Sequence, residues 1–392
     1  MLVLDGRGEC HSHFAGRSVD GIIDGLAAQA LPHSLGLMYE ELTEHLGFHR
    51  SSDEYKVMAL ASYADPDFLD EFRSLVRPRE DGGFEVQPID WARFAPPRRD
   101  GEPFRDAHAA LAASVQTRVE EMVLALAGWL HGRTGARGLA MAGGVALNCV
   151  ANGRLAAEGP FADIWVQPAA GEAGTALGAA VQVARASGDR ITPMGTAALG
   201  RGWSDEEIEA TLRIAAVEYE RPAALAATVA DVLAAGGVVG WFQGRSEYGP
   251  RALGHRSFFA SPTDRDMLRR LNDVKGREQF RPVAPIITLE RAGDVFDGVS
   301  PSPYMLFVHR VRPGWTERIP AVVHVDGTAR VQTVDRGDEP LVAEVLDEFE
   351  RRTGVPVLIN TSFNTAGRPM VDAPRAALEC FGASPIDALV LG

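Results

Sequence analysis

Cationic side chains gather in one segment of the second half of the chain. The sequence GRSEYGPRALGHR over residues 244–256 is followed by a lysine and two more arginines, and the segment as a whole carries Arg245, Arg251, Arg256, Lys275, Arg277 and Arg281. Arginines on glycine- and proline-rich turns suit bidentate binding of phosphate oxygens, and a lysine adds a compact charge for a leaving pyrophosphate. A solvated basic face is the alternative, but the glycine spacing and the flanking tryptophan and phenylalanine favour a phosphate site.

Short polar side chains follow an apolar stretch near the end of the chain. Residues 355–359 are apolar, and Asn360, Ser362 and Asn364 come directly after them. The carboxyl end of a strand is the usual ligand edge of an open α/β sheet, so we expect these side chains at a binding site. His324 also follows a short apolar run, but a lone histidine of this kind is more often structural than catalytic.

Two glycine turns in the first half each follow an apolar run and precede a helical pattern. Gly143 and Gly144 follow residues 138–142, and the turn at Gly171, Glu172 and Gly174 follows residues 164–166. Such turns direct backbone N–H groups and helix N-termini at phosphates, although ordinary connections have the same composition. Because two such turns occur within about fifty residues, a nucleotide site and a pair of ordinary connections are equally good interpretations.

The overall composition excludes several classes of protein. The chain has 392 residues, of which 46% are hydrophobic, and its 39 basic and 53 acidic residues give a formal net charge of −14. This charge argues against a general nucleic-acid or membrane-surface binder but leaves anionic metabolites open. Three distant cysteines indicate neither a disulfide framework nor a cysteine metal site, and no apolar run is long enough to span a membrane. We expect a cytoplasmic protein.

The elements alternate between strands and helices, which predicts an α/β fold in two domains. We expect strands at 2–4, 138–142, 164–166, 238–242, 305–308, 322–325, 331–334, 355–359 and 388–391. We expect helices near 111–126, 225–233, 266–272 and 341–352, one that starts at 145, and one that follows the 171–174 turn and runs through 186. Residues 78–106 are polar and proline-rich, as in a surface excursion. The Gly/Pro/Thr-rich stretch near 191–199 places the boundary between domains 1–195 and 196–392.

Several ordered motifs resemble those of the O-carbamoyltransferases of the NodU/CmcH type, the group that includes TobZ-like antibiotic-tailoring enzymes. They run along nearly the whole chain, at residues 5–9 (DGRGE), 32–37 (PHSLGL), 53–58 (DEYKVM), 143–148 (GGVALN), 167–171 (QPAAG), 249–254 (GPRALG), 280–282 (FRP), 324–330 (HVDGTAR) and 360–364 (NTSFN). So many motifs in the family's order set this resemblance apart from a chance similarity.

The resemblance implies a C-terminal domain of the YrdC-like mixed α/β fold that makes carbamoyl adenylate from carbamoyl phosphate and ATP, releasing phosphate and pyrophosphate. The KxR signature of that fold is matched by Lys275 and Arg277, and its SxN signature by Ser362 and Asn364. Lys275, Arg277, Arg281 and His324 are the expected catalytic residues. The expected ligand-binding residues of this domain are Arg245, Arg251, Arg256, Asn360, Ser362 and Asn364.

For the N-terminal domain the resemblance implies a TsaD-like ASKHA fold that clasps a nucleotide and a metal. Gly143, Gly144 and Asn148 match its nucleotide-binding turn, and Asp5 and Glu172 fall where such proteins place acidic metal ligands. Two features depart from the pattern. Glu172 replaces the usual aspartate, and the first lobe with its histidine pair has no counterpart, so we expect the second lobe only. Two acidic ligands would hold Fe²⁺ or Zn²⁺ poorly, whereas Mg²⁺ is expected with ATP.

The resulting hypothesis is an enzyme that carbamoylates a hydroxyl group of a small natural product, without nucleic-acid or membrane partners. Two alternatives stay open. A threonylcarbamoyl-adenylate synthase shares the YrdC signatures, although the motif at 249–254 is unexpected for it. A non-catalytic subunit would need a partner that supplies the missing lobe, or would form a homo-oligomer, because a lone lobe leaves an apolar face uncovered.

Overall fold

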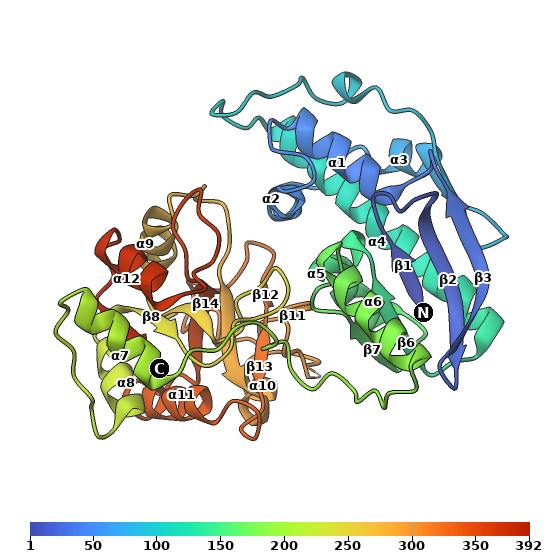
Figure 1. Cartoon of the computed structure of the whole chain (residues 1–392). Coiled ribbons are helices and arrows are strands. Elements are labelled where there is room, and N and C mark those ends of the chain that lie inside the picture. The colour runs from blue at the N-terminus through green and yellow to red at the C-terminus, as the bar shows by residue number, and fades with distance from the viewer. Residues whose placement is uncertain (300) are drawn as a thin grey trace. The chain divides into compact units, whose positions relative to one another are not determined.

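The computed structural model describes residues 1–299 and 301–392, which form two compact units, Met1–Thr192 and Pro193–Gly392. Each unit is a mixed α/β structure with its own sheet (Figure 1). The division falls inside the Gly/Pro/Thr-rich stretch from which the domain boundary was predicted.

The first unit is built on a five-stranded sheet in the order β3-β2-β1-β6-β7. β1, β2 and β3 form an antiparallel meander, and β1, β6 and β7 run parallel. Their bounds are β1 Leu2–Leu4, β2 His11–Val19, β3 Ile22–Ala30, β6 Gly138–Ala142 and β7 Asp163–Val166, and a separate hairpin pairs β4 Val76–Pro78 with β5 Phe84–Val86. The parallel strands place the turns after β1, β6 and β7 at one edge of the sheet.

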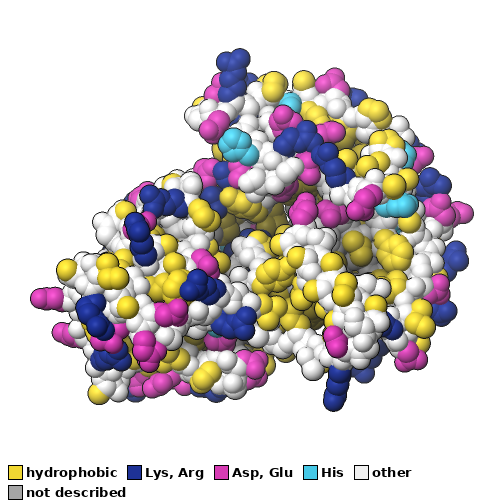
Figure 2. Space-filling model, in the orientation of Figure 1, with side chains coloured by type: hydrophobic (Ala, Val, Ile, Leu, Met, Phe, Trp, Pro, Cys, Tyr) yellow, Lys and Arg dark blue, Asp and Glu magenta, His cyan; other side chains and the backbone are white. Residues whose placement is uncertain are grey.

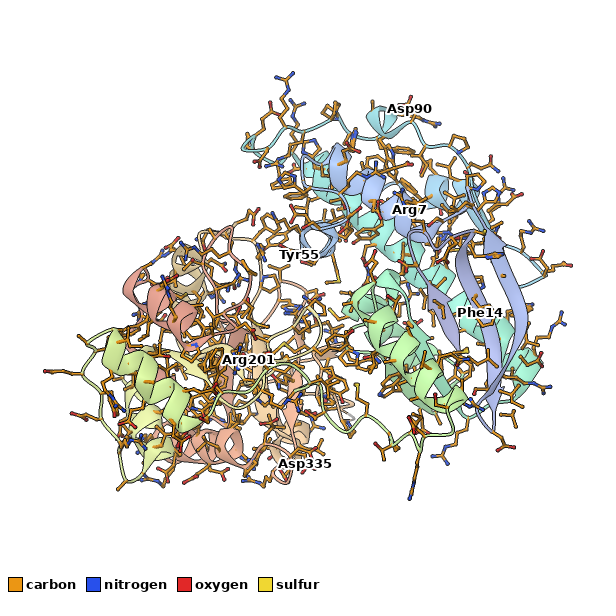
Figure 3. All side chains as sticks on the ribbon, in the orientation of Figure 1. Arg7, Phe14, Tyr55, Asp90, Arg201 and Asp335 are labelled. Carbon is orange, nitrogen blue, oxygen red and sulfur yellow. The ribbon has the colours of Figure 1, made fainter. Side chains whose placement is uncertain are left out.

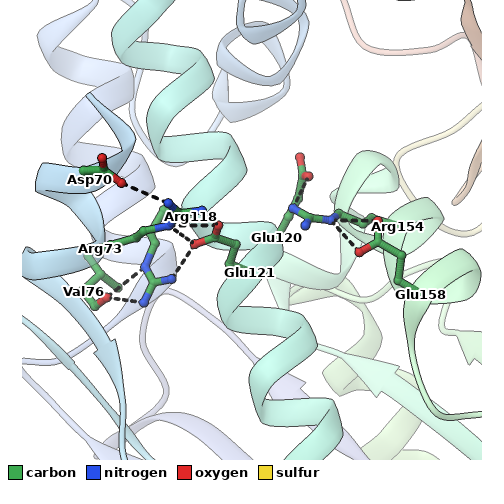
Figure 4. A network of polar contacts seen from close by, with 8 residues as sticks. All are labelled: Asp70, Arg73, Val76, Arg118, Glu120, Glu121, Arg154 and Glu158. Carbon is green, nitrogen blue, oxygen red and sulfur yellow. Dashed lines mark hydrogen bonds and ion pairs between the residues drawn. The ribbon is translucent and has the colours of Figure 1, made fainter. Parts of the chain in front are cut away.

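The helices of this unit are α1 Leu35–His45, α2 Glu54–Leu60, α3 Leu69–Leu75, α4 Asp106–Thr134, α5 Cys149–Glu158 and α6 Ala173–Ala186, with short 3₁₀ turns at Ala61–Tyr63, Trp91–Arg93 and Gly144–Leu147. The apolar face predicted for α4 is buried, with Leu111, Val119 and Leu126 each 2% exposed or less. Arg118 on α4 donates two hydrogen bonds to the carbonyl oxygen of Val76 and one to Glu121, which also binds Arg73 of α3 (Figure 4). This network fastens α3 and β4 to the long helix.

The second unit has a six-stranded sheet in the order β13-β10-β14-β9-β8-β15. Its strands are β8 Val238–Phe242, β9 Arg256–Ala260, β10 Ala284–Thr288, β13 Gln332–Val334, β14 Val357–Ser362 and β15 Ala388–Leu391, and β11 Val308–Arg310 pairs with β12 Thr328–Arg330 as a separate hairpin. The four central strands, β8, β9, β14 and β10, run antiparallel to one another in turn, while β15 and β13 add parallel strands at the two edges.

Helices α7 Asp205–Ile214, α8 Leu225–Ala234, α9 Asp266–Val274, α10 Leu289–Val295, α11 Pro340–Thr353 and α12 Pro374–Gly382 complete this unit. α8 and α11 pack against each other, and both contribute to a core built on the sheet. The side chains with no exposed surface in that core include Trp241, Phe258, Leu358 and Ile359. The sheet is therefore a rigid base for the loops at its strand ends.

Several elements differ from the sequence-based expectation. Residues 322–325 were expected to form a strand, but they form turns and irregular backbone before β12. The backbone N–H of His324 donates to the carbonyl of Thr328, which closes a turn. The strand expected at 305–308 begins only at Val308. The run 331–334 contributes β13 from Gln332 onward. The hairpin of β2 and β3 and the strands β9 and β10 were not anticipated.

Candidate active site

Lys275 and the turn from Ser362 to Asn364 meet in the second unit. Lys275 caps the C-terminal end of α9, and Ser362 is the last residue of β14. The Lys275 Nζ donates to Ser362 Oγ at 3.0 Å and to Asn364 Oδ1 at 2.6 Å, and also to the carbonyl oxygens of both residues, at 2.5 and 3.2 Å. The structure therefore joins the KxR lysine and the SxN turn, which lie more than eighty residues apart, in one contact.

The charge around Lys275 favours an anion. Lys275 is 6% exposed, and burial lowers its pKa well below the usual value. The charges of Arg277 and Arg281 lower the pKa of Lys275 further. An anion bound among these three cations would offset their repulsion and raise that pKa.

Asn272 holds the segment that carries the two arginines. This fully buried residue accepts a hydrogen bond from Arg277 Nε at 2.6 Å and donates one to the carbonyl of Arg281 at 3.1 Å. Gly276, just before Arg277, has φ +54°, and a Cβ there would lie 2.8 Å from the Cβ of Ala366. The sequence motifs did not single out Asn272, because its role depends on a loop conformation that spacing alone does not reveal.

Two predicted phosphate ligands have other uses in this structure. Arg256 has no exposed surface, and its guanidinium donates four hydrogen bonds of 2.7–3.2 Å to the backbone carbonyls of Arg201, Gln243, Gly244 and His255. Arg245 donates to the carbonyls of Leu199 and Gly200, both at 2.8 Å. In this structure these guanidinium groups fasten loops together, and their binding of a ligand stays a prediction.

Asn360 is also structural. Its side chain is fully buried and donates to Gln332 Oε1 at 2.7 Å and to the carbonyl of Ala252 at 3.3 Å. Gln332 in turn donates to the carbonyl of Leu253 at 2.7 Å. Asn360 therefore supports the loop at 249–254, which carries Arg251, while its Oδ1 is buried without a hydrogen-bond partner among the described residues, so its binding of a ligand stays a prediction.

His324 and Arg330 form a second polar group beside β12. His324 Nδ1 lies 3.1 Å from Thr328 Oγ1, and burial together with the charge of Arg330 lowers the pKa of His324 to about 4, against the opposing charge of Asp326. Among residues 1–299 and 301–392, neither His324 Nε2 nor Arg330 Nε has a hydrogen-bond partner, although both atoms are buried. A neutral imidazole beside a guanidinium suits an oxyanion. Arg330 lies within one of the sequence motifs but was not among the predicted site residues.

In the first unit, Asp5 and the Gly143–Gly144 turn meet at the sheet edge. Asp5 follows β1, and its Oδ1 accepts hydrogen bonds from the backbone N–H groups of Gly6 at 2.7 Å and Gly144 at 3.3 Å. Burial raises the pKa of Asp5, and the charges of Glu172 and Glu40 raise it further. The structure thus brings the predicted acidic residues Asp5 and Glu172 near each other and beside the glycine turn.

Asn148 is a helix cap. Its Oδ1 accepts from the backbone N–H of Ala151 at 3.0 Å at the start of α5, and its Nδ2 donates to Gln116 Oε1 at 2.9 Å. Both ends of the amide are used inside the unit. The Asn148 side chain therefore caps α5 in this structure, and its binding of a nucleotide stays a prediction.

The donor set at Asp5 and Glu172 distinguishes between metal ions. Within the described part of the chain, no group of three or more His, Cys, Asp and Glu side chains is arranged to hold a metal ion. Zn²⁺ sites use three or four protein ligands, so this set does not fit zinc. Mg²⁺ keeps several waters and is often held by one or two carboxylates with substrate phosphates, which Asp5 and Glu172 do fit.

Comparison with known proteins gives two family matches. Residues 1–181 match the model for the carbamoyltransferase N-terminus, and residues 230–392 match the model for the carbamoyltransferase C-terminus. Nodulation protein NolO of Bradyrhizobium diazoefficiens is 39% identical over 100% of this chain and 74% of its own length. The chain belongs to the carbamoyltransferase family.

This carbamoyltransferase chain spans only part of the length of its relatives. Nodulation protein NolNO of Sinorhizobium fredii is 39% identical over 100% of this chain and 60% of its own length. Among solved structures, P. abyssi Sua5 complexed with L-threonine matches with TM-score 0.33 and 16% identity over 44% of this chain and 48% of its own. No helix in the described part of the carbamoyltransferase is long and apolar enough to cross a bilayer. Basic and acidic side chains are interspersed over the face seen in Figure 2.

Proposed function

We propose that this carbamoyltransferase makes carbamoyl adenylate in its second unit and transfers the carbamoyl group to a hydroxyl of a small natural product. The contact of Lys275 with Ser362 and Asn364 carries the proposal, because it joins the YrdC-like KxR and SxN signatures in one buried cationic site. Arg277 and Arg281 add charge for the phosphates of ATP and carbamoyl phosphate.

The proposed chemistry has three balanced steps. Water cleaves carbamoyl phosphate to carbamate and phosphate; a carbamate oxygen then attacks the α-phosphorus of ATP, and pyrophosphate leaves with the electron pair of the broken P–O bond. The acceptor hydroxyl finally attacks the carbamoyl carbon, loses its proton and releases AMP. Lys275, Arg277 and Arg281 would offset the charge that develops on the leaving pyrophosphate. Mg²⁺ would supply further charge to the phosphates.

The first unit is the proposed site of transfer, as a TsaD-like lobe. The support is local: Asp5, Glu172 and the Gly143–Gly144 turn lie at one edge of the sheet, where phosphate groups and Mg²⁺ can be bound. The acceptor is proposed to be a small molecule, with no nucleic acid or membrane involved.

The test is release of pyrophosphate from ATP that depends on carbamoyl phosphate. Lys275→Ala should lower this release at least about a hundredfold, since it removes the central cation of the site. Lys56→Ala is the matched control, because Lys56 is the other lysine of the chain and pairs with Asp53 in the first unit, at 3.1 Å.

Equal loss in both variants, or no carbamoyl-phosphate dependence in the folded wild-type protein, would contradict the proposal. Activity with threonine and bicarbonate in place of carbamoyl phosphate would instead support a threonylcarbamoyl-adenylate synthase.

We also propose that a partner, or a second copy of the chain, covers apolar surface on the first unit. Val19, Ile22 and Ile23 of the β2–β3 hairpin are 57–69% exposed, and Val183 on α6 is 66% exposed. Clustered exposed apolar side chains favour association. Light scattering after size-exclusion chromatography tests this, and a protein that stays monomeric at high concentration and binds no partner lobe would contradict it.

A further inference from the structure

Glu247 organises the backbone of the loop that carries Arg251. Its Oε1 accepts hydrogen bonds from three backbone N–H groups, those of Leu253 at 2.6 Å, His255 at 2.9 Å and Arg256 at 3.1 Å. Glu247 is 8% exposed. One buried carboxylate oxygen thus binds the loop at three points within four residues.

Side chains also bind both backbone groups of Gly254 in this loop. The N–H of Gly254 donates to Ser257 Oγ at 3.0 Å, and the carbonyl of Gly254 accepts from Trp241 Nε1 at 2.8 Å. Gly254 has φ +103°, a conformation that neither a helix nor a strand imposes. The path of the loop therefore depends on these side chains, and Glu247 makes most of the contacts to its N–H groups.

The charge of Glu247 has a separate role from its hydrogen bonds. It favours the charged forms of Arg256 and His255, both of which are largely buried. Among the residues that the structure describes, Glu247 Oε2 is buried without a hydrogen-bond partner. A glutamine would keep an oxygen for the three N–H groups but would remove this charge, so the two roles can be tested apart.

We propose that Glu247 is a positioning residue that holds loop 249–256 in the conformation that presents Arg251 to the phosphate of carbamoyl phosphate. The inference rests on the proposed function for the ligand, but the conformational part stands on the geometry of the loop alone. Arg251 lies in the sequence between Glu247 and Leu253, which are bonded to each other, so loss of this bond changes the position of its backbone.

The first experiment measures hydrogen exchange in the full chain. Glu247→Ala should speed exchange of the amides at 253, 255 and 256 at least about tenfold, because each loses its acceptor, and Glu247→Gln should change it by less than about threefold. Asp335→Asn is the matched control: Asp335 (Figure 3) lies in the same unit and accepts from the backbone N–H of Gly337 at 2.7 Å. Unchanged exchange in folded Glu247→Ala would overturn the proposal.

The second experiment measures the KM for carbamoyl phosphate separately from kcat. Glu247→Ala should raise this KM about tenfold or more while the KM for ATP changes by less than about threefold. Faster amide exchange in Glu247→Ala with an unchanged KM for carbamoyl phosphate would overturn the positioning role. Activity that falls only in proportion to the folded fraction of the variant would overturn it as well. If the wild-type protein releases no pyrophosphate, the proposed function fails. Calorimetry with inorganic phosphate then tests the inference by itself: weaker binding by Glu247→Ala than by the wild-type protein supports it, and equal binding overturns it.

Discussion

Replacing Gly143 with alanine should destabilise the first unit more than any other single-methyl change at its glycine turns. Gly143 has φ 89° and ψ 157°, a region that is essentially restricted to glycine and costs other residues about 1–3 kcal/mol. A Cβ at this position would also lie 2.1 Å from the carbonyl oxygen of Leu4 in β1, so the two backbones must separate. Overpacking of this kind costs about 1–3 kcal/mol more, and the total is about 2–6 kcal/mol.

Hydrogen exchange of peptides from β1 and β6 measures this loss locally, without assuming that both units unfold together. Two glycines serve as controls. A Cβ on Gly171 meets nothing within 4 Å, so Gly171→Ala should change the free energy of unfolding by about 0.5 kcal/mol or less. Gly188 has φ +84° in open space, so Gly188→Ala isolates the backbone term. Equal effects of Gly143→Ala and Gly171→Ala would refute the reasoning.

Two further predictions concern stability. Burial alone would lower the pKa of His255, but its contact with Glu339 at 2.9 Å raises that pKa above the usual 6.5. The free energy that protonated His255 adds to folding is therefore fully present below pH 6.5 and is lost as the pH rises through the raised pKa. Urea unfolding at several pH values should show a smaller loss of stability over this range in Glu339→Gln than in the wild-type protein. Arg118→Met should cost about 1–3 kcal/mol because it leaves the carbonyl of Val76 without its two guanidinium donors. Arg137→Met removes an exposed pair with Asp163 in the same unit and should cost about 1 kcal/mol or less in the same denaturant measurement.

The fold could be predicted where apolar runs are bounded by glycines. β6, β8 and β15 lie at the expected residues for this reason. The β2–β3 hairpin was missed because its sequence mixes glycine, charge and apolar residues, and β3 is largely exposed. The two strands form because β2 is hydrogen-bonded to β1 on one side and to β3 on the other, although the side-chain pattern does not alternate as in a typical strand.

The sequence predicted which residues of the candidate site lie in contact only in part. Lys275 and Ser362 were expected together, and they are in contact. Arg256 and Asn360 were expected at a ligand, yet both are bonded within the protein itself. A sequence shows that a guanidinium is present, but whether backbone carbonyls already occupy its N–H groups depends on the path of loops that the sequence does not reveal.

The pairing of β1 with β6 also has a consequence for synthesis. Leu2 lies opposite Met141, so β1 must wait for a partner that is made about 139 residues later. At about 5–20 residues per second, that interval is on the order of ten seconds. During it the meander of β1, β2 and β3 is without its parallel neighbour, and its apolar residues are open to chaperones and to other nascent chains.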